Sequence, residues 1–335
     1  MGIGRAAQGA DGATSSMLCA LALMAGTATL ACDEHGWEGT RPHGSNAPPT
    51  NRVCTYAVWS VEDMLVGNVS YGPYDNYVSQ LSVRAYNPSI NSWRIIPGYQ
   101  PFGTRRLGTV VWSGKEMLVW GGSDSSQEPA NYEDLNTGAA YNPETNTWRS
   151  LATLGAPEPR SWHVALWTPL GMLIWGGTRE YEDINSGGIY DPDSDSWTSM
   201  GSLRAPVGRT EPAAVFADGQ LLLWGGHYFE ATSGYSVRMV MPPEIALYTP
   251  QTGKWTVFRG IGAPQLPEDA ITGENNAFWI NDKLYVWGFA NFPISEGFIY
   301  DPQGNNWSRT CKTWILDHAL LGEPFRIEPS VVWTG

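Results

Sequence analysis

Apolar and polar residues along this chain follow a pattern that recurs about every 50 residues. In the second repeat, a short β-branched and aromatic run leads into the turn residues Ser113–Lys115, and a second apolar run ends at Gly121 and Gly122. Two apolar runs of this length around a tight turn predict a β-hairpin. We expect its strands at Thr109–Trp112 and Met117–Trp120.

A second pair of strands is predicted later in the same repeat. A third apolar run begins at Ala139, enters a turn at Pro143 and continues as a fourth strand at Trp148. Proline fixes φ for such a turn, and Asn146 tolerates a left-handed backbone. After residue 50, no segment keeps a helical apolar period over three turns. Four short antiparallel strands per repeat, arranged in series, predict the blades of a β-propeller.

Tryptophan marks the repeats, because fourteen of the 17 tryptophans occupy three recurring offsets. The first series closes the element Tyr-x-Pro-x4-Trp, and its members are Trp93, Trp148, Trp197, Trp255 and Trp307. The second series contains Trp59, Trp112, Trp167, Phe216, Trp279 and Trp333. Each member of the third series lies eight residues after its partner in the second series, and its members are Trp120, Trp175, Trp224 and Trp287. We expect these rings to fill the wedge between neighbouring sheets, where each buries about 150–250 Å².

These motifs resemble the kelch repeat, in which a hydrophobic strand ends in Gly-Gly and is followed by a Tyr and then a Trp after a short turn. The resemblance covers about residues 55–310. It implies an all-β, kelch-type β-propeller with five four-stranded blades and the first strand of a sixth. The expected blades span residues 55–97, 108–150, 162–200, 211–258 and 275–310, with a partial blade at 328–335.

The partial blade can be interpreted in two ways. Residues 329–335 match the start of the second repeat, at Val110–Gly114. We expect a truncated six- or seven-bladed ring within a propeller domain of residues 52–335. The alternative is that this last strand completes closure with the N-terminal blade. An open ring leaves an unpaired blade face, which is an aggregation liability.

The N-terminal region predicts export. Met17–Ala31 is uncharged and mostly apolar, which fits the core of a signal peptide spanning residues 1–31 and is too short for a bilayer. Thr29–Cys32 resembles a bacterial lipoprotein cleavage box and makes Cys32 a candidate for lipidation and a membrane tether. Ordinary cleavage after Ala31 is the alternative. Residues 32–51 are expected to form a flexible linker. The protein would then be periplasmic, at the cell surface or secreted.

Loop lengths distinguish the two faces of the expected propeller. The spacing between strands one and two, and between strands three and four, is constant, whereas the loop between strands two and three varies. Variable loops on a rigid scaffold are where binding usually occurs. Arginine recurs on this variable face, seven residues before the second-series aromatic, at Arg52, Arg105, Arg160, Arg209 and Arg326. These guanidinium groups either bond backbone carbonyls of the adjacent blade or form an arc for a carboxylate or other anion.

Other polar side chains on this face are further candidates. The carboxylates of two similar loops either gather a cation such as Ca²⁺ or are solvated turn residues, and they are Glu133, Asp134, Glu182 and Asp183. His163 and His227 are expected to reach the same face, but two histidines without a third ligand predict no metal site. Tyr228 offers a ring for sugar stacking, although its loop can equally pack on itself.

Composition limits the range of partners. The net charge of −13 with only 20 lysines and arginines argues against nucleic acid. Export would permit a disulfide between Cys54 and Cys311. No Ser-His-Asp, P-loop or dinucleotide motif occurs in a fitting context, so no cofactor is expected.

We therefore expect a non-catalytic binding propeller for a carbohydrate, peptide or protein. The resemblance also admits an enzyme, because kelch propellers include sialic-acid epimerases and the central domain of galactose oxidase. An epimerase-like pocket would use Arg160, Arg209 and Glu211. A galactose-oxidase-like copper site needs a cysteine cross-linked to tyrosine near histidine ligands, and it is disfavoured because neither Cys54 nor Cys311 lies in such a constellation.

Overall fold

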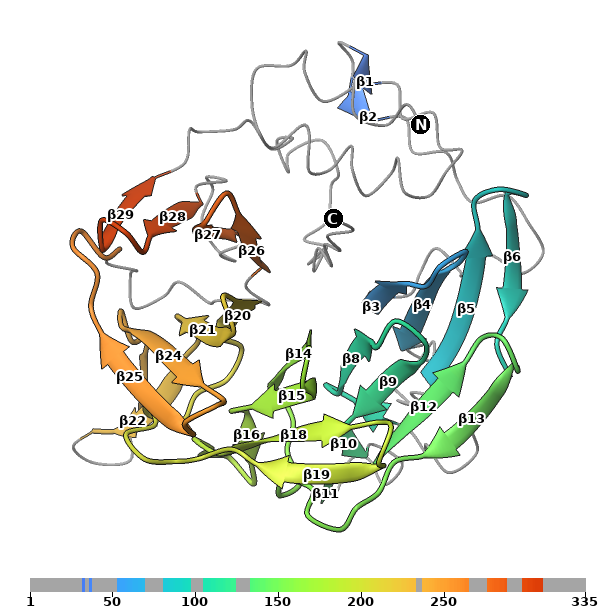
Figure 1. Cartoon of the computed structure of the whole chain (residues 1–335), viewed down its shortest axis with the longest axis horizontal. Coiled ribbons are helices and arrows are strands. Elements are labelled where there is room, and N and C mark those ends of the chain that lie inside the picture. Colours follow the sequence, from blue (N-terminus) through green and yellow to red (C-terminus); the bar gives the residue numbers. More distant parts are fainter. Residues whose placement is uncertain are drawn as a thin grey trace.

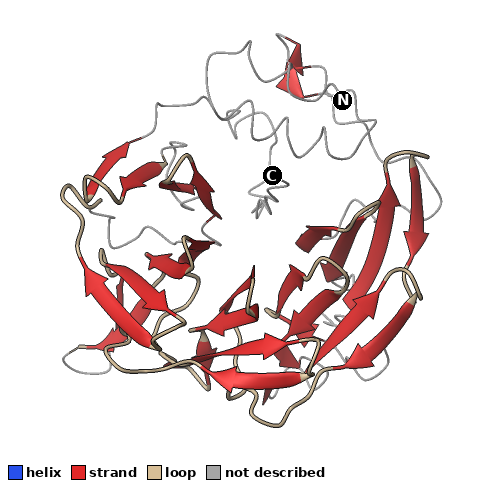
Figure 2. Cartoon of the chain, viewed as in Figure 1, coloured by secondary structure: helices blue, strands red, loops and turns tan. Residues whose placement is uncertain are grey.

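The computed structural model of the chain describes residues 32–33, 36–37, 53–69, 81–97, 105–124, 133–232, 237–264, 276–287 and 297–309. Within these residues the regular structure consists of strands and contains no helix (Figure 2). Five four-stranded antiparallel sheets follow one another around an arc (Figure 1). The prediction of an all-β protein built from propeller blades is confirmed.

Each blade is an up-and-down sheet whose strands follow one another in sequence. Blade 1 contains β3 (Val53–Trp59), β4 (Met64–Val69), β5 (Leu81–Asn87) and β6 (Ser92–Ile95). Blade 2 contains β8 (Thr109–Trp112), β9 (Met117–Trp120), β12 (Gly138–Asn142) and β13 (Thr147–Ser150). Blade 3 contains β14 (Val164–Thr168), β15 (Gly171–Trp175), β18 (Gly187–Asp191) and β19 (Ser196–Ser199).

Blades 4 and 5 repeat the same order. Blade 4 contains β20 (Ala213–Ala217), β21 (Gln220–Trp224), β24 (Ile245–Thr249) and β25 (Lys254–Phe258). Blade 5 contains β26 (Asn276–Ile280), β27 (Lys283–Trp287), β28 (Phe298–Asp301) and β29 (Asn306–Arg309). The first strand of each blade lies nearest the centre and beside the first strand of the next blade (Figure 1).

The Tyr-x-Pro-x4-Trp element fixes the turn between the third and fourth strands. In blade 3, Tyr190 lies opposite Trp197, and their ring centroids are 5.1 Å apart. The Tyr190 hydroxyl donates to Asp195 Oδ1 at 2.6 Å, and Asp195 has a φ of 47°. Asn91, Asn146 and Asn305 repeat this left-handed conformation, as does Gly253 in blade 4. The left-handed backbone expected at Asn146 is therefore confirmed, and it recurs at the same turn position of the other blades.

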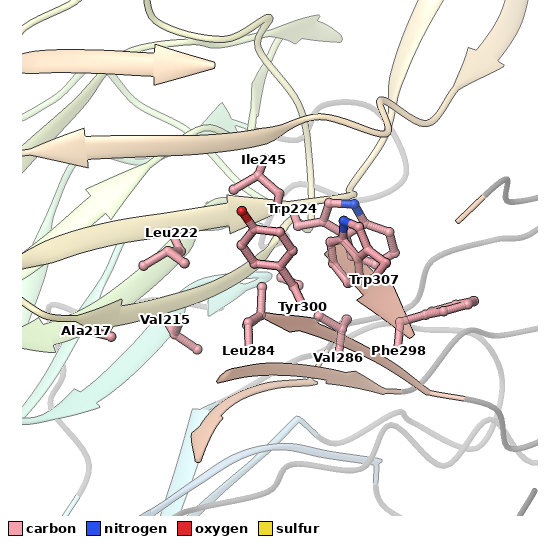
Figure 3. Packing of buried hydrophobic residues seen from close by; sticks show 11 residues of the cluster. Val215, Ala217, Leu222, Trp224, Ile245, Leu284, Val286, Phe298, Tyr300 and Trp307 are labelled. Carbon is pink, nitrogen blue, oxygen red and sulfur yellow. The ribbon is translucent and has the colours of Figure 1, made fainter. Parts of the chain in front are cut away.

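Tryptophans also join neighbouring blades. Trp120, Trp175 and Trp224 end the second strands of blades 2 to 4 and are almost completely buried. Each packs against the first-series tryptophan of the following blade; for example, the ring centroids of Trp224 and Trp307 are 4.7 Å apart (Figure 3). Rings of this size carry much of the apolar burial in each core. These three tryptophans of the third series therefore stabilise the junctions between blades.

Several sequence predictions lie outside the described residues. They concern the signal peptide at 1–31, Arg52, Arg326, Cys311 and the partial blade at 328–335. Within 32–51, β1 (Cys32–Asp33) pairs with β2 (Gly36–Trp37). In the described part of the chain, no helix has the length and apolar character needed to cross a membrane.

Candidate functional site

The connectivity separates two faces of the arc. The turn face carries the turns between strands one and two and between strands three and four. The loop face carries the loops between strands two and three and the connections between blades. The loop face of the described residues also carries three small sheets. The first is formed by β7 (Arg105–Arg106), β10 (Ser123–Asp124) and β11 (Glu133–Asp134). The second pairs β16 (Thr178–Arg179) with β17 (Glu182–Asp183), and the third pairs β22 (Tyr228–Ala231) with β23 (Val237–Val240).

Two of the predicted acidic residues connect these small sheets. Asp134 Oδ2 accepts a hydrogen bond from the backbone N–H of Glu180 at 3.1 Å, in the loop of the following blade. Asp183 Oδ2 accepts from the N–H of Phe229 at 3.1 Å, one blade further on. Glu133 and Glu182 are exposed beside them. Among the residues that the structure describes, no group of three metal-binding side chains occurs.

The guanidinium groups of the three described arginines of the series point into their own blades. Arg160 is completely buried, and it donates to the carbonyl oxygens of Gly176 and Ser186 at 3.1 and 2.8 Å. Arg105 donates in the same way to Gly121 and Thr137, and Arg209 donates to the Gly225 carbonyl. Burial lowers the pKa of Arg160 and of Arg209 to about 10, which leaves both charged at neutral pH.

The backbone of the same arginines joins adjacent blades. The Gly122 N–H of blade 2 donates to the Arg160 carbonyl at 2.8 Å. The Gly177 N–H of blade 3 donates to the Arg209 carbonyl at 2.9 Å. The second glycine is needed here, because Gly177 has a φ of 87° and an added Cβ would lie 2.3 Å from the Ser161 carbonyl oxygen. The side chain of Arg160 or Arg209 thus donates to the first glycine of the pair in its own blade. The backbone carbonyl of the same arginine accepts from the second glycine of the pair in the preceding blade.

His163 is enclosed between two of these arginine positions. Its Nε2 lies 2.7 Å from the Thr109 hydroxyl, and its ring meets Trp120 edge-on with centroids 5.2 Å apart. Burial, together with the positive charges of Arg160 and Arg105, lowers the pKa of His163 to about 3. The imidazole is therefore neutral, and it is packed inside the scaffold instead of being displayed on the loop face.

A further repeated feature lies two residues after each described arginine. Leu107, Trp162 and Glu211 have φ values of 56°, 57° and 50°. Their backbones form a ladder across the blades, because the Trp162 N–H donates to Leu107 O at 3.4 Å and the Glu211 N–H donates to Trp162 O at 3.2 Å. A left-handed conformation at a bulky residue costs about 1–3 kcal/mol, and such strain concentrates at functional sites. We call these three residues the left-handed ladder.

The three ladder residues share one backbone conformation but carry different side chains. Trp162 is 39% exposed, while Leu107 and Glu211 are half-buried. Sequence reasoning assigned a role only to Glu211 and missed Leu107 and Trp162, because neither residue type favours this conformation. The constant two-residue offset from the arginine series is the signal that could have found them.

The other predicted residues lie in the fourth loop. The Thr210 hydroxyl lies 3.0 Å from His227 Nε2, and the His227 ring meets Phe229 edge-on at 5.5 Å. Burial lowers the pKa of His227. Tyr228 donates its hydroxyl hydrogen bond to Glu230 at 3.1 Å within the same small sheet. These contacts lie mainly within the loop.

Comparisons with known proteins agree with this architecture. A family model of the KLHDC2/KLHL20/DRC7 kelch-repeats domain matches residues 107–314. Among solved structures, that of YjhT is similar, with a TM-score of 0.57 and 14% identity over 76% of this chain and 82% of that chain. At this identity the likeness shows the fold alone. No curated protein matches the chain. The family match covers most of the repeats, and the chain belongs to the kelch-repeat domain family.

Proposed function

We propose that this propeller is a non-catalytic binding module that holds a peptide or protein segment on its loop face. The left-handed ladder is the observation that carries the proposal. Its backbone is the same in three consecutive blades, but its side chains are an aliphatic, an indole and a carboxylate. A strained backbone that is kept while its side chains differ fits selective recognition better than packing alone.

The surroundings of the ladder favour a peptide or protein over a small polar ligand. Tyr181 and Phe229 lie on the same face and are 95% and 51% exposed, and Trp162 is exposed as well. Exposed aromatic side chains are enriched in the energetic centres of protein interfaces. The buried arginines hold the connections that carry the ladder, so their role in binding would be positional.

An enzymatic role has less support from the geometry. The epimerase-like pocket expected from the family resemblance needs Arg160 and Arg209 to face a substrate. Their guanidinium groups instead donate to backbone carbonyls inside their own blades and are almost completely buried. The burial of these arginines therefore supports a binding module over an enzyme.

The test uses the full chain as bait for a displayed library of random peptides. We expect selected peptides to lose about tenfold or more in affinity for Trp162→Ala and for Glu211→Ala, which corresponds to at least about 1.4 kcal/mol at a central contact. Trp167→Ala is the matched control, because it removes an exposed tryptophan from the turn face. Peptides that bind wild type and both ladder variants equally would refute the site.

Export and lipid attachment at Cys32 complete the proposal. Their support is the uncharged segment Met17–Ala31 and the sequence Thr29–Cys32. In a bacterial host fed labelled palmitate, we expect wild type to be labelled in the membrane fraction and Cys32→Ala to lose the label. An unlabelled chain that is cleaved after Ala31 and recovered in the periplasm would leave export standing and contradict lipidation.

A further inference from the structure

A cleft of about 460 Å³ lies on the turn face, between blades 2 and 3. Blade 2 contributes the β8–β9 turn and Arg149, which lies in β13. Blade 3 contributes Trp167, Leu170 and the turn that follows β18. The volume is within the roughly 300–1,000 Å³ of small-molecule sites. The cleft belongs to the face that the constant spacing marked as structural, opposite the left-handed ladder.

Trp167 differs from its counterparts in the other blades. Trp112, Phe216 and Trp279 pack against the hydrophobic cores of their junctions. Trp167 does not belong to the core between blades 2 and 3, and it is 37% exposed where it lines the cleft. Leu170 lies on the same rim and is 46% exposed. Because the Trp167 indole does not pack in the core between blades 2 and 3, its apolar surface is available to a ligand.

The polar wall of the cleft is held rigidly. Arg149 donates to both carboxylate oxygens of Glu116, at 3.2 and 2.6 Å, and to the hydroxyl of Tyr190 at 3.0 Å. The hydrogen bond to Glu116 raises the pKa of Arg149 well above its ordinary value. Such a two-pronged pair fixes its geometry before any ligand arrives. It therefore offers fixed polar edges opposite the indole.

The charges that line the cleft nearly balance. Lys115 and Arg149 stand against Glu116, Asp191 and Asp193. Arg149 is already paired with Glu116, and Asp191 accepts from the Ser194 hydroxyl at 2.7 Å and from the Asp193 N–H at 3.0 Å. These partners lower the pKa of Asp191. A site whose charges nearly cancel does not select a strongly ionic ligand.

We propose that this cleft binds a neutral saccharide, with one pyranose ring stacked on Trp167. A pyranose with equatorial hydroxyls has an apolar C–H face that fits an indole, while its hydroxyl edges both donate and accept hydrogen bonds. The carboxylate and guanidinium edges of Glu116, Arg149 and Asp193 supply partners of both kinds. This site is separate from the peptide site proposed on the loop face.

The experiment titrates the full chain with neutral tetrasaccharides, cellotetraose and maltotetraose, and with an acidic one, tetragalacturonate. Tryptophan fluorescence and calorimetry report binding. We expect a neutral tetrasaccharide to bind wild type, Trp167→Ala to weaken it at least about tenfold, and Trp167→Tyr to retain part of the affinity. Trp162→Ala is the matched control and should bind like wild type.

The proposal would be overturned by the absence of neutral-sugar binding by folded wild type, by equal binding by Trp167→Ala, or by preferred binding of tetragalacturonate. Circular dichroism and thermal melting of each variant separate loss of binding from loss of fold. Loss of sugar binding in Trp162→Ala would also contradict the cleft, because it would move the site to the loop face. Peptide binding in the same variants tests the loop face separately.

Discussion

The turn face and the loop face differ in how far their side chains repeat from blade to blade. On the turn face, the same side chains repeat from blade to blade, as with the Tyr–Trp pairs whose ring centroids are 4.9–5.2 Å apart. On the loop face the buried arginines also repeat, but in the left-handed ladder only the backbone repeats, while the side chains differ. A repeat fold can therefore keep its buried side chains on both faces and vary the ladder side chains on one of them.

The hydrogen bonds of the two faces also differ in exposure. On the turn face, Arg149 forms its ion pair with Glu116 while its side chain is 35% exposed. On the loop face, Arg160 satisfies backbone carbonyls from full burial. Removing a buried charged donor leaves carbonyls without partners, whereas water replaces a partner at an exposed pair. A buried polar side chain on the loop face should therefore contribute more to the free energy of unfolding than an exposed one on the turn face.

The largest expected effect is that of Arg160→Ala. We expect it to lower the free energy of unfolding by about 2–6 kcal/mol, because the carbonyls of Gly176 and Ser186 lose their donors inside the protein at a cost of about 1–3 kcal/mol each. Urea unfolding measures the change. Arg179→Ala is the control on the same face, since its side chain is 44% exposed and pairs with Glu158 at 3.5 Å. Equal effects of the two substitutions would contradict the proposed role of burial.

A smaller effect is expected from the neutral His163. Its pKa is about 3 in the folded protein and about 6.5 in the unfolded chain, so between these values the unfolded state binds the extra proton. The stabilisation is therefore complete above about pH 6.5 and is lost as the pH falls towards 3. Between about pH 7 and pH 5, wild type should lose about 2 kcal/mol more than His163→Gln. Urea titrations of both proteins at each pH measure this difference, and parallel pH profiles would show that His163 is not kept neutral.

The smallest expected effect concerns the turn face. Tyr190→Phe removes a hydroxyl that donates to Asp195 and accepts from Arg149, and we expect a loss of about 1–1.5 kcal/mol. Tyr248→Phe is the matched control, because the Tyr248 hydroxyl only accepts from Gly201 N–H at 3.3 Å and has Gly253 in place of Asp195. Urea unfolding should show the smaller loss for Tyr248→Phe. A loss for Tyr190→Phe as large as that for Arg160→Ala would remove the contrast between the faces.

Sequence reasoning predicted the parts of the molecule that depend on local patterns. The strands Thr109–Trp112 and Met117–Trp120 were predicted from apolar runs and a turn, and the structure has them at the same bounds. The left-handed turn at Asn146 was predicted because asparagine itself favours that conformation. Local chemistry determined each of these features.

Features that depend on side-chain direction were beyond the reach of the sequence. Spacing placed Arg105, Arg160 and Arg209 at one position of the fold, but it left open whether they face a ligand or the backbone. The left-handed ladder was hidden because leucine, tryptophan and glutamate share no preference for its geometry. Trp167 belongs to the same series as Trp112, and only packing shows that one lines a cleft while the other joins a core.

The bond from the Gly122 N–H to the Arg160 carbonyl gives the assembly of the propeller a direction. Blade 2 lacks a partner for this amide until the connection into blade 3 is in place, and blade 3 depends on Arg209 in the same way. Blades 2 and 3 are therefore each completed by the following blade, as in a repeat array in which stability passes between nearest neighbours. During synthesis from the N-terminus, folding of blade 3 should stabilise blade 2, and folding of blade 4 should stabilise blade 3.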